Sequence, residues 1–121
     1  MIKITLKGLP KTTNSNSRQT WRAQRAESRK WKNLVSKYVY IHLLKPEKPF
    51  AKAKVTITRY SSNEPDFDGL VSAGKHLIDG LIEAGILEND RMSNIGRPEY
   101  LWERAPRNQG HVTIEVEEVS E

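Results

Sequence analysis

Two long segments with the 3.6-residue period of amphipathic helices interrupt a chain whose other hydrophobic residues alternate with polar ones. The alternating segments span residues 2–7, 53–60 and 111–117. A period of two residues is typical of strands that bury one face. A weaker strand is predicted around Glu99 to Trp102, and residues 103–110 are predicted to form a long hairpin loop.

The helical patterns lie between these strands. The first begins at Ser17 or Thr20 and ends at Leu44, with an apolar stripe in its second half made by Trp31, Leu34, Val35, Tyr38, Val39 and His42. The second runs from about residue 67 to residue 84, and Gly85 is predicted to act as its C-terminal cap. Together these patterns predict one α+β domain over residues 1–121, with a small mixed sheet of about four strands and two main helices.

The chain contains no cysteine, which excludes disulfides and thiolate metal sites. Any metal must therefore be held by oxygen or imidazole ligands, which favours Mg²⁺ or Mn²⁺. The sequence lacks a signal-peptide core and a run of about 18 apolar residues. We therefore expect a cytoplasmic protein that does not contact a membrane.

Charge is distributed unevenly along the chain. Residues 1–59 hold 15 Lys/Arg and 2 Asp/Glu, a balance of +13, whereas residues 60–121 hold 5 and 13, a balance of −8. A basic half suits a polyanion such as a nucleic acid, and an acidic half suits metal ions. The alternative is two ordinary solvated surfaces that neutralise each other.

A basic stripe marks the start of the first helix. Arg18, Arg22, Arg25 and Arg29 are three or four residues apart, which places them on one side of a helix. This spacing predicts contacts with DNA phosphates, and Asn14 in the preceding polar loop is a further candidate. The alternatives are a solvated helix face and a turn held by local asparagine hydrogen bonds.

The acidic motif most relevant to chemistry is Asp66-Phe67-Asp68. In an extended chain, side chains two residues apart point the same way, so two carboxylates converge. A divalent cation between them would relieve their repulsion. Alternatively, Asp68 simply caps a helix that begins at Gly69.

The helix after this motif carries a polar stripe of Asp68, Ser72, Lys75 and Asp79 opposite its apolar side. Lys75 could bind the scissile phosphate or stabilise transition-state charge. Asp79 lies too far along an unbroken helix to share a metal with Asp68, so we assign it a supporting role in orienting Lys75. Residues 85–90 are long enough for Asp90 to return to Asp66 and Asp68 as a third metal ligand.

The run from residue 65 to residue 91, PDFDGLVSAGKHLIDGLIEAGILENDR, resembles the core signature of RusA-type Holliday junction resolvases. Asp66 and Asp68 match the family's Asp-x-Asp pair, Lys75 and Asp79 its Lys-x-x-x-Asp element, and Asp90 its last carboxylate. The match departs from the family in two places. Some members have the lysine about one turn after the second aspartate, whereas here the gap is seven residues, and Asn89 stands where some have another aspartate.

The resemblance implies a homodimer that binds four-way DNA junctions and nicks two strands symmetrically with Mg²⁺ or Mn²⁺, in DNA recombination and repair. It also implies catalytic roles for Asp66, Asp68, Lys75 and Asp90, with the three aspartates as metal ligands. Two other hypotheses remain open at this point. One is a metal-dependent nuclease acting on other branched DNA or on RNA, and the other is a DNA-binding protein without catalytic activity.

Overall fold

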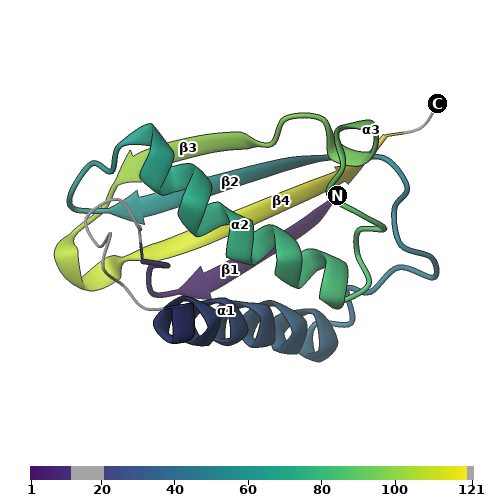
Figure 1. Ribbon diagram of the computed structural model, residues 1–121, viewed down its shortest axis with the longest axis horizontal. Coiled ribbons are helices and arrows are strands. Elements are labelled where there is room, and N and C mark those ends of the chain that lie inside the picture. Colours follow the sequence, from purple (N-terminus) through teal and green to yellow (C-terminus); the bar gives the residue numbers. More distant parts are fainter. Residues whose placement is uncertain (12–20, 120–121) are drawn as a thin grey trace.

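The computed structural model describes residues 1–11 and 21–119. It confirms the α+β class, with a four-stranded mixed sheet and two main helices, and adds a short helix that the sequence patterns did not predict (Figure 1). The strands are β1 (Ile2–Lys7), β2 (Ala53–Ser61), β3 (Glu99–Arg104) and β4 (His111–Glu118), and the α-helices are α1 (Trp21–Ile41), α2 (Phe67–Glu83) and α3 (Met92–Ile95).

The strands are arranged in the order β1-β4-β2-β3. β4 is antiparallel to both β1 and β2, whereas β2 and β3 are parallel. The predicted hairpin at residues 103–110 is therefore wrong, because β3 and β4 are not neighbours. Residues 105–110, with a 3-10 turn at Arg107–Gln109, instead carry the chain from the edge strand past β2 to the interior of the sheet.

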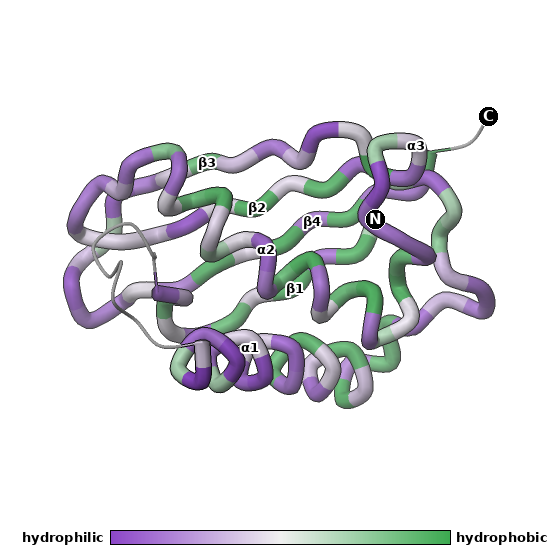
Figure 2. Tube along the Cα trace, viewed as in Figure 1, coloured by the Kyte–Doolittle hydropathy of each residue, from purple (hydrophilic) through white to green (hydrophobic). Residues whose placement is uncertain are grey.

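The hydrophobic core lies between the sheet and the two main helices. Its fully buried members include Ile4, Trp31, Val35, Val55, Leu77, Leu81, Ile114 and Val116. In Figure 1, α2 crosses one face of the sheet and α1 lies alongside β1. Figure 2 shows the corresponding sequence pattern, with hydrophobic residues in the strands and a largely hydrophilic first half of α1.

The predicted apolar stripe of α1 is largely confirmed. Trp31, Val35 and Val39 are buried, whereas His42 is exposed just beyond the end of the helix. The two helices approach closely at Gly80, where an added β-carbon would lie 2.9 Å from the β-carbon of Val35. No helix in the described ranges is both long and apolar enough to cross a bilayer.

Leu43, two residues after the end of α1, has a left-handed conformation with φ of 53°, and its side chain is 87% exposed. A left-handed residue is common just after a helix, but glycine is favoured there because a β-carbon is strained in this conformation. Leu43→Gly relieves this strain but adds entropy to the unfolded chain, so it is expected to raise the free energy of unfolding by about 0.5–1 kcal/mol. Urea denaturation measures the change. Leu43→Ala is the control, since it keeps the β-carbon; an equal gain in both variants would contradict the explanation.

Candidate functional site

The site begins at the edge of the sheet where β1, β2 and β3 end. These three strands run in the same direction, since β4 is antiparallel to β1 and β2, and β3 is parallel to β2. Residues 62–66 lead from β2 into α2, so the Asp66-Phe67-Asp68 motif lies at the first turn of the helix.

Asp66, rather than Asp68, caps α2. Its Oδ1 accepts a hydrogen bond of 2.9 Å from the backbone N–H of Gly69, and its backbone is extended, as is usual for an N-cap. The alternative in which Asp68 caps a helix beginning at Gly69 is therefore wrong, because the helix begins two residues earlier. Asp68 is exposed in the first turn, where a carboxylate is stabilised by the positive end of the helix dipole.

Lys75 connects two carboxylates at the middle of α2. Its Nζ donates to Oδ1 of Asp79 at 3.0 Å and to Oδ2 of Asp90 at 3.1 Å. Asp79 lies one turn further along the same helix, whereas Asp90 comes from the segment after it. The structure thus brings together three of the residues singled out from the sequence, as a cation held between two acids.

The hydrogen bond to Asp79 raises the pKa of Lys75; desolvation opposes this rise, and the bond to Asp90 adds to it. A raised lysine pKa means that Lys75 is fully charged below its ordinary value and that its charge, with its contribution to the bridge, is lost as pH rises through the folded-state value. We therefore expect the Lys75 bridge to remain intact throughout the neutral range. Because the side chain of Lys75 is 59% exposed, solvent screens the bridge and it contributes little to stability.

The predicted metal ligands do not form one cluster in this structure. Within the described ranges, no three Asp, Glu, His or Cys side chains are arranged to hold a metal ion. Lys75 lies seven residues beyond Asp68, which is about 10 Å along a helix axis. Two oxygen ligands of one Mg²⁺ lie only about 3 Å apart, since each is about 2.1 Å from the ion. In the described ranges, Asp66, Asp68 and Asp90 are therefore not gathered around one ion.

The segment that carries Asp90 is fixed by contacts far away in the sequence. The N–H of Phe50 donates to the carbonyl of Ile86 at 2.8 Å, and the N–H of Glu88 donates back to the carbonyl of Phe50 at 3.0 Å. This pairing directs the chain to the middle of α2 rather than to its first turn. α2 is not broken at Gly74, so Asp68, Lys75 and Asp79 keep the spacing of a continuous helix.

Tyr100, on β3, is a site residue that the sequence analysis missed. Its ring packs over Gly74, where an added β-carbon would lie 2.6 Å from its Cε1. It also meets Phe67 edge to face, with ring centroids 6.2 Å apart. Burial raises the pKa of Tyr100, and the charge of Lys75 partly offsets that rise. The sequence signal that could have identified Tyr100 is Gly74, a small residue on the side of α2 that packs against β3.

The basic residues of α1 are only partly available for a ligand. Arg22, Arg25 and Arg29 are exposed, but Arg25 lies over the ring of Trp21 at 5.3 Å, and Arg29 pairs with Glu83 of α2 at 3.2 Å. The other two predicted DNA contacts, Asn14 and Arg18, lie outside the described residues. A hollow of about 420 Å³ on this helix is lined by Arg25, Arg29 and Lys32 with two small residues.

Half-buried Arg59 is a further cation, near the end of β2 that leads into α2. Its guanidinium donates to the carbonyl of Pro10 at 2.7 Å, and burial lowers its pKa. Among the described residues, its Nε is buried without a hydrogen-bond partner.

Comparison with models of protein families finds no match to this chain, and a search of curated proteins finds no significant relative.

Proposed function

We propose that this protein is a Mg²⁺- or Mn²⁺-dependent endodeoxyribonuclease that resolves four-way DNA junctions as a homodimer. The observation that carries the proposal is the Lys75 bridge, which joins a helix bearing the Asp66-Phe67-Asp68 motif to the separate segment bearing Asp90. A cation beside several carboxylates on an exposed surface is suited to bind a phosphodiester next to a metal ion.

The oxygen donors suit the proposed metal, but in the described ranges they are not gathered around one position. Mg²⁺ commonly keeps several waters and takes one or two protein carboxylates together with substrate phosphates. Asp66, Asp68 and Asp90 are the ligands we propose, and their convergence requires Asp90 to leave Lys75. When bound, the ion would lower the pKa of a water molecule and neutralise charge on the phosphate.

The basic surface of α1 supports a DNA substrate. Arg25, Arg29 and Lys32 surround a hollow on this helix, and cations that contact phosphates position DNA without reading its sequence. A homodimer would present two such sites, which matches the two-fold symmetry of a four-way junction.

A second candidate is a DNA-binding protein without nuclease activity. The N-cap bond of Asp66 favours it, because capping alone accounts for an aspartate at this position. Asp79 and Asp90 would then serve only to hold Lys75.

Cleavage of a synthetic four-way junction tests the two candidates. With Mg²⁺, the nuclease is expected to make paired nicks in the junction and none in a linear duplex of matching sequence, and EDTA should stop the reaction. Asp68→Asn is expected to lower the cleavage rate by about 10²–10³ while junction binding persists. Glu64→Gln, an exposed acid in the preceding loop, is the control. Junction binding without cleavage in the unmodified protein would establish the second candidate.

A further inference from the structure

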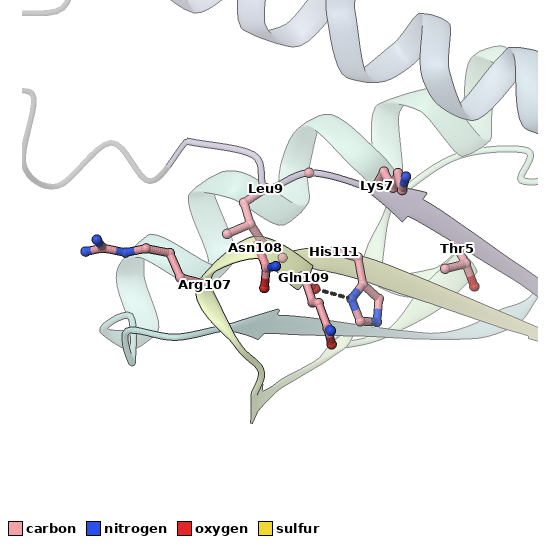
Figure 3. Close-up of a pocket in the computed structure, with 9 residues that line it drawn as sticks. Thr5, Lys7, Leu9, Arg107, Asn108, Gln109 and His111 are labelled. Carbon is pink, nitrogen blue, oxygen red and sulfur yellow. Dashed lines mark hydrogen bonds between the residues drawn. The ribbon is translucent and has the colours of Figure 1, made fainter.

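A large open pocket lies at the edge of the sheet where β1 ends and β4 begins. Its volume is about 810 Å³, and the chain after β1 and the loop before β4 form its sides. The backbone N–H of Gly8 donates to the carbonyl of Gly110 at 3.0 Å, which ties the two sides together. Figure 3 shows Lys7 and Arg107 toward opposite ends of the view, with Leu9, Asn108, Gln109 and His111 between them.

The lining of this pocket favours an anion. Lys7 and Arg107 supply two exposed positive charges, and none of the described residues that line the pocket is an aspartate or glutamate. Asn108 and Gln109 add exposed amides that can both donate and accept hydrogen bonds. Two cations without a nearby acid are suited to phosphate groups rather than to a neutral ligand.

His111 gives the pocket an ordered aromatic surface. Its ring stacks on Tyr60, with centroids 4.2 Å apart and planes 5° from parallel. Its Nδ1 lies 2.8 Å from the carbonyl oxygen of Gln109 (Figure 3), so this nitrogen must carry a proton to make the bond. Within the described part of the chain, no residue bonds the other ring nitrogen, which is therefore open to a ligand. A nucleobase can extend such a stack because every base has an aromatic face.

We propose that this pocket binds one nucleotide of single-stranded DNA. Lys7 and Arg107 contact the phosphates on either side of the nucleoside, and the base packs against His111 and Leu9 within reach of the two amides. The pocket lies at the same end of the sheet as the first turn of α2. The inference rests on the proposed function in naming DNA as the ligand.

Fluorescence anisotropy with a labelled 12-residue oligothymidylate, in EDTA, tests this site without cleavage. Lys7→Gln/Arg107→Gln is expected to weaken binding at least tenfold and to reduce the salt dependence, as log K against log salt, by about 1.4. The control is Lys48→Gln/Lys54→Gln, which removes two exposed charges elsewhere and should change the affinity less than twofold. Equal weakening in both double variants, or none in the first, would overturn the proposal.

NMR of ¹³C-labelled histidine rings gives a second readout. Adding the oligothymidylate or thymidine monophosphate should shift the His111 ring signals and leave exposed His42, at the end of α1, unchanged. Inorganic phosphate alone should shift them less, because it lacks a base. An unmoved His111 signal with intact junction cleavage would reject this site alone, whereas a responsive His111 without cleavage would reject only the nuclease.

Discussion

Asp90→Asn is expected to lower the metal-dependent cleavage rate of a four-way junction by about 10²–10³ while leaving junction affinity nearly unchanged. Asp90 is the one proposed metal ligand that the structure places next to Lys75, at 3.1 Å. An amide keeps the shape of the side chain but removes the charge that holds a divalent ion. Single-turnover cleavage assays measure the rate, and binding assays in EDTA measure the affinity.

Two variants separate this role from general effects of charge. Glu88→Gln removes an exposed acid two residues earlier and should change the rate less than threefold. Asp79→Asn removes a carboxylate partner of Lys75 but no proposed metal ligand, so it should lower the rate only about tenfold, as expected of a positioning residue. Equal losses in Asp79→Asn and Asp90→Asn would show that both carboxylates act only through Lys75.

Trp31→Ala is expected to destabilise the protein by about 3–5 kcal/mol, a large part of the roughly 5–15 kcal/mol typical of a domain. Trp31 is 1% exposed in the core, and its Nε1 donates to Oε2 of Glu27 at 2.8 Å. The same Glu27 oxygen accepts from the backbone of Lys11 at 2.8 Å, which attaches the chain after β1 to α1. Truncation leaves a cavity and removes one of these bonds. Urea denaturation measures the loss.

Trp21→Ala is the matched control on the same helix. Trp21 is 62% exposed and contacts Arg25, so its truncation should cost no more than about 0.5–1 kcal/mol. A similar cost for both variants would mean that the core does not depend on α1 as the structure indicates.

The fold could be predicted where local patterns decide it. Alternation located β1, β2 and β4. α2 ends at Glu83, one residue before the predicted end, with Ala84 as its C-cap and left-handed Gly85, at φ of 86°, directly after it. The partner of β3 could not be predicted, because alternation gives the buried face of a strand but not its neighbour. The four-residue α3 is too short to show a period.

In the candidate site, too, the contact within one helix could be predicted and the contacts between distant segments could not. Lys75 and Asp79 are four residues apart on one helix, so their contact follows from helix geometry. The position of Asp90 depends on the pairing of Phe50 with Leu87, a contact between distant segments that spacing alone cannot reveal. Similarly, Tyr100 reaches the site only because β3 lies beside β2.

The position of β4 between β1 and β2 has a consequence for folding kinetics. In the described chain, β1 has no sheet partner except β4, and Ile2 pairs with Val116, 114 positions later. The helices can form from nearby residues, but this pairing must close a loop of more than a hundred residues. Chains rich in such distant contacts fold in about milliseconds to seconds rather than microseconds. Docking of β1 is therefore expected to be a late event.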